Sequence, residues 1–204
     1  AGARGDGADV WSSAAGANWA FHGNAPWGRR ALMGAAVHGG RIYVIAGNSG
    51  TIVYRNDVWS TADGSSWALE TDGGFPYRDT LVTKNLTATA AASFHGKLWA
   101  LGGETYDYST GSITAPIHHY SAWMSAWSSP DGVTWTDALA LDPAGQWPAR
   151  AMTRAAVFND RLWICGGGFC HYGDVWRMED VPGDYRAPWT RTLDDGAAFS
   201  GRNG

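Results

Sequence analysis

The sequence predicts an all-β fold built from repeated four-stranded sheets, and three observations lead to this prediction. A strand-like segment centred on a tryptophan occurs four times, with that tryptophan at positions 11, 59, 127 and 176. Apolar residues show no helical period anywhere in the 204 residues. The recurrence, at intervals of roughly 50 residues with one longer interval, indicates a repeat architecture.

Each copy of the repeat joins two tryptophan strands by a turn. The first strand reads Asp-Val-Trp in three copies, beginning at Asp9, Asp57 and Asp174. A second tryptophan follows at positions 19, 67, 135 and 189. The turn contains Asp-Gly at 63–64 and at 131–132, a dipeptide that favours a tight hairpin, and it is longer in the fourth copy. Each copy therefore predicts an antiparallel strand pair.

A corner of the form aromatic-x-x-Arg closes each copy, and two further strands follow the first three corners. The corners end at Arg30, Arg78, Arg150 and Arg202. The next strand is built of small residues, at 34–37, 90–93 and 154–157. The strand after it is mainly aliphatic and ends in small residues, at 41–47, 97–103 and 161–167. Small residues suit a crowded axis, and four-stranded sheets arranged radially make a β-propeller.

These features resemble kelch repeats. The resemblance rests on the small-residue end of the aliphatic strand, which is Gly-Gly at 102–103 and 166–167, on its central aromatic residue, and on the later tryptophan. The Asp-Val-Trp-Ser strand, turn and Asp-Gly-x-x-Trp strand resemble the galactose-oxidase-like kelch propellers common in secreted bacterial proteins. The resemblance covers almost the whole chain and implies an extracellular or cell-surface location. It leaves function open, because such propellers include enzymes, binding modules and structural proteins.

The repeat boundaries predict one propeller domain or segment over 1–204. We expect a partial blade at 1–30, a blade at 31–78, a blade with loop insertions at 79–150 and a blade at 151–202. The tryptophan strand pair occurs four times, but the small and aliphatic pair occurs only three times. Propellers have roughly 4–8 blades. We therefore expect either that these residues belong to a longer chain or that a second chain completes the ring through the incomplete blade.

Composition narrows the possible partners. The net charge is −4, with 15 basic and 19 acidic residues and no basic run, so we expect no nucleic-acid partner. No apolar run approaches the roughly 20 residues that span a bilayer, so no membrane span is expected. The paired tryptophans are best interpreted as core, because each buries about 200 Å².

Strand alternation predicts where a binding site lies. The connection after the second strand and the connection between blades leave a four-stranded blade on the same face. The longest repeat carries two insertions on this face, one between Arg78 and Lys97 and one between Gly103 and Trp127. Loops on a rigid scaffold commonly carry binding residues. We therefore predict that the face carrying 79–90 and 104–122 binds a protein or a glycan. The equal alternative is that these loops pack on their own blade.

The candidate ligand-binding residues come from the long loop and from the corners. The loop contributes Tyr106, Tyr108, His118, His119 and Tyr120, whose rings and hydrogen-bonding groups suit sugars or a protein. The four corner arginines form either a cationic ring that binds a carboxylate or sulfate, or ties between blades through backbone carbonyls. The tie is the favoured alternative.

Two other motifs bear on chemistry. Cys165 and Cys170 are the only cysteines; they lie close enough for a disulfide if the loop folds back, although Cys165 equally suits a small core position. Asn85-Leu86-Thr87 is a glycosylation sequon. His118-His119 does not predict a metal, because adjacent residues on a strand point to opposite faces. No metal or cofactor is expected.

Enzymatic chemistry finds little support. Galactose oxidase needs copper held by Tyr and His ligands, and no residues here match that pattern; the turn at 129–135 is one residue shorter than the sialidase turn. No nucleophile–base pair or phosphate loop is visible. We therefore expect a non-catalytic extracellular binding module. The alternatives are the propeller domain of a secreted carbohydrate-active enzyme, oxidase or sialidase-like, and a structural subunit of a surface assembly that self-associates through unpaired blade edges.

Overall fold

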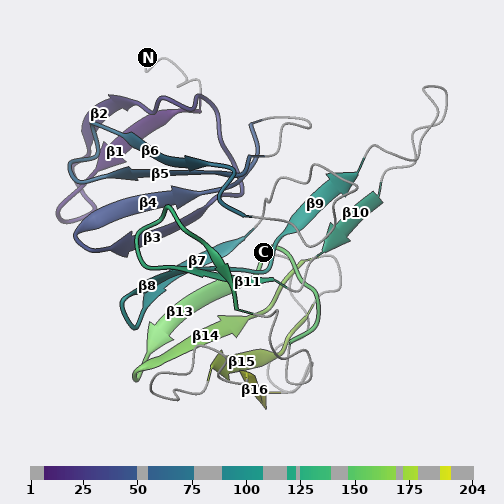
Figure 1. The fold of residues 1–204 in the computed structure, drawn as a ribbon. Coiled ribbons are helices and arrows are strands. Elements are labelled where there is room, and N and C mark those ends of the chain that lie inside the picture. Colours follow the sequence, from purple (N-terminus) through teal and green to yellow (C-terminus); the bar gives the residue numbers. More distant parts are fainter. Residues whose placement is uncertain are drawn as a thin grey trace.

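The computed structural model describes residues 7–49, 55–75, 89–107, 119–122, 125–138, 147–168, 172–178 and 189–193. Within these ranges the strands form three four-stranded and two two-stranded antiparallel sheets. All of these sheets except one two-stranded sheet lie side by side (Figure 1). The same ranges contain no helix long and apolar enough to cross a membrane.

The second blade shows the plan of a complete repeat. Its strands are β3 (Gly34–His38), β4 (Arg41–Ile45), β5 (Asp57–Thr61) and β6 (Ala68–Asp72). They pair antiparallel in chain order, so that each strand bonds to the next one along the sequence. This is the order that the sequence predicts: small-residue strand, aliphatic strand, first tryptophan strand, second tryptophan strand.

Two further blades and one partial blade repeat this plan. The third blade is β7 (Ala90–Phe94), β8 (Lys97–Leu101), β11 (Ala126–Ser129) and β12 (Thr136–Asp137). The fourth is β13 (Arg154–Phe158), β14 (Arg161–Cys165), β15 (Val175–Met178) and β16 (Trp189–Leu193). The first, partial blade is the pair β1 (Asp9–Ser12) and β2 (Ala20–Asn24), which corresponds to β5 and β6. The predicted architecture of three complete blades and one partial blade is confirmed.

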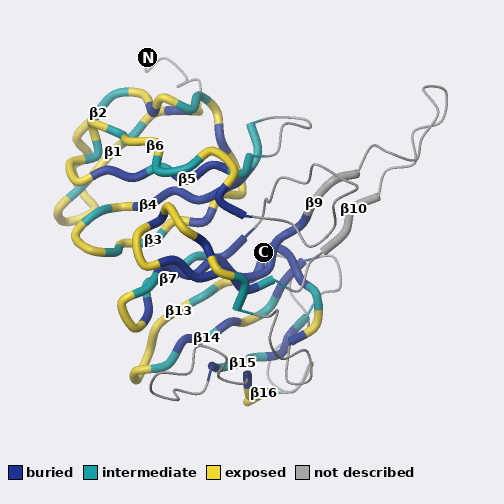
Figure 2. The backbone as a smooth tube through the Cα atoms, in the orientation of Figure 1, coloured by how far each residue is buried: buried dark blue, intermediate teal, exposed yellow. Residues whose placement is uncertain are grey.

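The core lies between neighbouring sheets. Tyr43 and Ile45 of β4 share one apolar cluster with Leu98 of β8 and Trp127 of β11. A second cluster joins the third and fourth blades in the same way. Figure 2 shows the buried residues along these facing strands and the exposed ones at the turns. Packing of one sheet face against the next is therefore what holds successive blades together.

The inner strands are crowded, as their small residues predict. β7 lies against both β3 and β13. A Cβ atom at Gly34 would lie 3.0 Å from the Cβ of Ala91 and 3.2 Å from Cγ2 of Thr89. These separations leave no room for a larger side chain at Gly34 without a shift of the neighbouring strand.

The long segment after β8 differs from the loop that the sequence predicts. It contains a two-stranded ribbon of β9 (Glu104–Asp107) and β10 (His119–Ala122), which extends away from the stacked blades (Figure 1). Each strand has only four residues and a mixed polar and aromatic composition, so neither alternation nor aliphatic content marks it. The local sequence of the two strands therefore does not predict their pairing.

Candidate functional site

A hollow of about 440 Å³ opens at one end of the inner strands. Its walls come from three successive blades, at 32–35, 89–91 and 152–155. These residues stand at or just before the starts of β3, β7 and β13, where the connections between blades enter. The hollow therefore lies on the face that the sequence predicts as the binding face.

The walls of the hollow combine apolar side chains with one charged group. Leu32 and Met33 are each 42% exposed, and Met152 contributes from the fourth blade. Arg154 is the one charged residue among the described residues that line the hollow. Its Nη1 donates to the carbonyl oxygens of Met152, at 3.1 Å, and of Thr153, at 3.2 Å, and the residue remains exposed. The hollow thus offers an apolar rim beside an exposed guanidinium group.

The rim is held by an unusual backbone conformation that two blades share. Leu32 has a φ of 54° and Met152 a φ of 56°, in the left-handed region that non-glycine residues rarely adopt. Each follows its corner arginine by two residues, and each is preceded by a bridge, Ala31 to Asn48 or Ala151 to Gly168. The repeated geometry indicates that the corner determines how these side chains meet the hollow.

Arg30 is tied into the second blade. Its Nη1 donates to Oδ1 of Asp57 at 2.6 Å and to the carbonyl oxygen of Ala46 at 2.8 Å, and its Nη2 donates to Oδ2 of Asp57 at 2.7 Å. Burial raises the pKa of Asp57, but the hydrogen bonds from Arg30 and Trp59 outweigh this effect and hold the pKa below its usual value. The carboxylate is therefore the form that the fold requires.

Arg150 makes the same arrangement in the fourth blade. Its Nη1 donates to Oδ1 of Asp174 at 2.6 Å and to the carbonyl oxygen of Gly166 at 3.0 Å, and its Nη2 donates to Oδ2 of Asp174 at 3.0 Å. Burial again raises the pKa of Asp174, and the hydrogen bonds from Arg150 and Trp176 again outweigh it and lower the pKa.

The two arginines connect each corner to the blade that follows it. Their side chains are only 1% and 0% exposed, and bidentate carboxylates occupy both guanidinium groups. The geometry favours a structural tie over a ligand-binding ring, and it adds aspartates that the sequence interpretation did not include. Arg78 and Arg202 lie outside the described residues.

The third blade departs from this pattern. Ser125 stands where Asp57 and Asp174 stand in the other blades, and its hydroxyl donates to the carbonyl oxygen of Gly102 at 2.8 Å. Glu104, at the start of β9, is only 3% exposed, and its Oε2 has no hydrogen-bond partner among the residues that the structure describes. Burial raises the pKa of Glu104 to about 7. The blade that carries the ribbon thus holds a buried acid beside the face that the sequence predicts for binding.

Replacing Glu104 with Gln should stabilise the protein above pH 7 and leave it almost unchanged below pH 4.5. The pKa rises from 4.5 in the unfolded chain to about 7 in the fold, so the folded protein binds more protons between these values. The free energy of unfolding therefore falls as the pH rises through this window. We expect Gln to add about 2 kcal/mol above pH 7.

Urea denaturation at both pH values measures this effect. Asp72→Asn, at an exposed strand position, is the matched control and should change stability by less than about 0.5 kcal/mol at either pH. A gain from Glu104→Gln of the same size at both pH values would mean that the carboxyl is not titrating as described.

The ribbon brings together three of the loop residues that the sequence singles out. Tyr106 stands directly opposite Tyr120, and His119 stands directly opposite Asp107. Tyr108 and His118 lie outside the described residues, so their predicted roles stay predictions.

The remaining sequence motifs are only partly described. Cys165 ends β14, is exposed, and has no disulfide partner among the described residues. Cys170 and the sequon residue Asn85 fall outside those residues, so the disulfide and glycosylation sites stay predictions. Across the same ranges, no group of three or more His, Cys, Asp or Glu side chains is placed to hold a metal ion.

Sequence reasoning missed the residues around the hollow. The sequence pattern places Arg154 at the start of a small-residue strand. Gly34 and Ala90 stand at this position in the other blades, so a large charged residue here breaks the pattern. That interruption of the small-residue pattern was the available signal. Met33 and Met152 carried no comparable signal, because their exposure depends on where three blades meet.

The comparisons with known proteins agree with the fold. Radially repeated four-stranded sheets define the class of β-propellers. Residues 29–60 match the family model of the Kelch motif, which spans β3, β4 and most of β5. Residues 29–60 therefore carry a kelch motif, the described sheets have the fold of a β-propeller, and kelch repeats generally serve in protein interactions.

The solved structure of a protein called YjhT shares the fold, with a TM-score of 0.61 and 16% sequence identity. The match covers 84% of this chain and 48% of that one, so this chain spans about half the length of the solved structure. No curated protein matches the sequence.

Proposed function

We propose that this chain is a non-catalytic interaction module that binds an extended protein segment. The binding face is the one that carries the hollow and the β9–β10 ribbon. The kelch motif at 29–60 supports the class of function, and the ribbon supports the mode of binding.

The inserted ribbon is the observation that carries this proposal. Within the described residues, β9 and β10 pair only with each other, so no described strand bonds to either outer edge of the ribbon. An extended segment of a partner protein can add to such an edge as a further strand, with main-chain hydrogen bonds supplying affinity. The ribbon begins directly after β8, and therefore at the end of the blade from which the hollow opens.

The residues that line the hollow would select which side chains of the partner segment bind. Leu32, Met33 and Met152 offer apolar and adaptable contacts, and methionine suits surfaces that accept varied partners. Arg154 adds a guanidinium group that pairs well with a carboxylate. A partner segment with an aliphatic residue next to an acidic one fits this arrangement. We further propose an extracellular or cell-surface location, which the resemblance to secreted kelch propellers supports.

Removing the ribbon tests the proposal. Random peptides displayed as a library, together with a glycan array, are the probes for the full chain and for a variant in which a short Gly-Ser turn replaces 105–121. We expect peptides with an acidic residue to bind the full chain and to bind the variant about 100-fold more weakly. Biolayer interferometry with the best peptide measures the difference.

Val133→Ser provides the control for this experiment. Val133 is 46% exposed in the turn between β11 and β12, at the end of the blade opposite to the hollow. This variant should bind the peptide as the full chain does. Peptide binding that survives removal of the ribbon would place the site elsewhere, and binding of glycans alone would replace the protein partner with a carbohydrate.

A further inference from the structure

The root of the ribbon, made of Gly102, Gly103 and Ser125, is where β9 and β10 join the third blade. Gly102 and Gly103 lead from β8 into β9, and both have a positive φ, of 65° and 124°. Gly102 N donates to the carbonyl oxygen of Ser125 at 2.8 Å, and Ser125 Oγ donates to the carbonyl oxygen of Gly102, also at 2.8 Å. Because Ser125 follows the end of β10 by three residues, these bonds hold the two legs of the ribbon together.

The root also lies against the corner that leads into the fourth blade. Gly103 N donates to the carbonyl oxygen of Arg150 at 2.9 Å. A Cβ atom at Gly102 would lie 2.7 Å from that carbonyl oxygen and 3.2 Å from Cγ2 of Thr153, so the close approach requires glycine. Thr153 lines the hollow. The root therefore connects the ribbon to the wall of the hollow.

Glu104 is the first residue of the ribbon beyond the root. It stands directly opposite Ala122, so the two residues form the pair with which the ribbon begins. Glu104 is nevertheless buried, and its Oε2 has no hydrogen-bond partner among the residues that the structure describes. A buried carboxyl group thus lies at the base of a ribbon that otherwise extends away from the blades (Figure 1).

The repeat itself does not require an acid at this position. The turn before Glu104 recurs in the other complete blades, where 46–47 and 166–167 also have positive φ at both residues. The residue that follows this turn is Asn48 in the second blade and Gly168 in the fourth, and neither side chain titrates. Only the blade with the inserted ribbon places a titratable group here, which links the acid to the ribbon and not to the stacking of blades.

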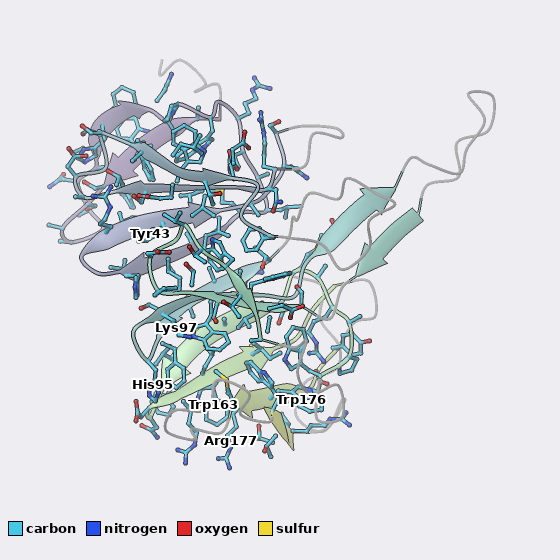
Figure 3. All side chains as sticks on the ribbon, viewed as in Figure 1. Tyr43, His95, Lys97, Trp163, Trp176 and Arg177 are labelled. Atoms are coloured by element: carbon cyan, nitrogen blue, oxygen red, sulfur yellow. The ribbon has the colours of Figure 1, made fainter. Side chains whose placement is uncertain are left out.

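No described cation neutralises this carboxyl group. The charged or titratable residues on the elements that meet at the root are Arg150, Arg154, Asp174, Lys97, Asp107 and His119. Arg150 and Asp174 bind each other, and Arg154 donates to carbonyl oxygens of its own segment. Figure 3 shows Lys97 at the end of β8 that lies away from the ribbon. Asp107 and His119 form the pair at the far end of the ribbon, three positions from Glu104.

We propose that Glu104 is a proton-controlled latch that holds the ribbon on the third blade. A protonated carboxyl group can stay buried at the root, whereas a carboxylate without a cation is costly to bury. Loss of the proton therefore favours an open state. In this state Glu104 reaches solvent, its pairing with Ala122 is lost, and the ribbon turns about Gly102 and Gly103.

The latch would regulate the binding face. A partner segment that adds to the ribbon and also reaches the hollow needs both in a fixed arrangement, so the closed latch favours its binding. This consequence rests on the proposed function, whereas the latch itself concerns only the free chain.

Hydrogen–deuterium exchange of the free chain tests the latch. Burial raises the pKa of Glu104 to about 7 in the closed state, from 4.5 in solvent, so the closed state binds more protons and opening increases as the pH rises between these values. After correction for the chemical effect of pH on amide exchange, we expect the opening of 104–107 and 119–122 to rise about 25-fold from pH 5.5 to pH 8. Glu104→Gln should exchange at both pH values as the unaltered chain does at pH 5.5.

Three controls separate the latch from a general loss of stability. The buried amides of 43–45 in β4 should change by less than about twofold over the same pH range. Asp72→Asn, at an exposed strand position, should keep the pH dependence of the unaltered chain. Glu104→Met also has no proton to lose, so its ribbon should exchange independently of pH even if the Gln amide disturbs the root.

Either of two results would overturn the proposal. One is an opening of the ribbon amides that is equal at pH 5.5 and pH 8 in the unaltered chain. The other is a pH dependence that persists in both Glu104→Gln and Glu104→Met, which would assign it to another group. No peptide is present in these measurements, so a confirmed latch together with peptide binding that survives removal of the ribbon would contradict the proposed function alone.

Discussion

Replacing Arg150 with Met is expected to lower the free energy of unfolding by about 3–5 kcal/mol, because it leaves a buried carboxylate without its cation. Asp174 is 1% exposed and receives both Nη1 and Nη2 of Arg150. The carbonyl oxygen of Gly166 also loses its donor. Met fills much of the volume of the Arg side chain, so the loss reflects the charge and the hydrogen bonds more than a cavity.

Urea denaturation measures this loss, with Arg154→Met as the matched control. Arg154 is exposed and, among the described residues, its hydrogen bonds go to carbonyl oxygens of its own segment, so its replacement should cost less than about 1 kcal/mol. The double variant Arg150→Met with Asp174→Leu should be more stable than Arg150→Met alone, because it removes the unpaired charge. If Arg150→Met abolished peptide binding at unchanged stability, Arg150 would be a ligand-binding residue and not a tie.

Replacing Trp147 with Ala is expected to cost about 3–5 kcal/mol. Trp147 is 0% exposed in the cluster between the third and fourth blades. Its ring meets Trp189 edge to face, and the guanidinium group of Arg150 lies 5.8 Å from the ring centroid. Ala would leave a cavity beside both groups, and the surrounding sheets have little freedom to close it.

Thermal and urea unfolding of Trp147→Ala and Trp19→Ala make the comparison within one residue type. Trp19 is 59% exposed, so its replacement should cost less than about 1 kcal/mol. If both variants lost the same free energy of unfolding, Trp147 would not stabilise the contact between the third and fourth blades in the way that its packing indicates.

The candidate site was only partly predictable from the sequence. Strand alternation identified the face on which the hollow and the ribbon lie, because the alternation depends only on strand count. That this face binds a partner stays a prediction. The hollow was not predicted, since 32–35, 89–91 and 152–155 are far apart in sequence and meet only when three blades stack. The ribbon was expected as a loop, because its pairing joins two short polar segments across an intervening stretch of chain.

The order of strands in each blade followed from the sequence alone, whereas the prediction that the paired tryptophans form the core was wrong for Trp11 and Trp19, which are 48% and 59% exposed. Side chains alternate along a strand and the repeat recurs through the chain, so small, aliphatic and tryptophan strands could be placed without coordinates.

The role of the corner arginines, in contrast, depends on how the blades stack. Arg30 and Asp57 are visible in the sequence as two separate repeated signals. Their pairing requires the corner of one blade to meet the start of a strand in the next. The same stacking decides which tryptophans are buried: Trp135 and Trp19 have equivalent places in the repeat, and a neighbouring blade covers only Trp135. Burial is a property of the neighbours that a residue acquires, and the local sequence does not encode those neighbours.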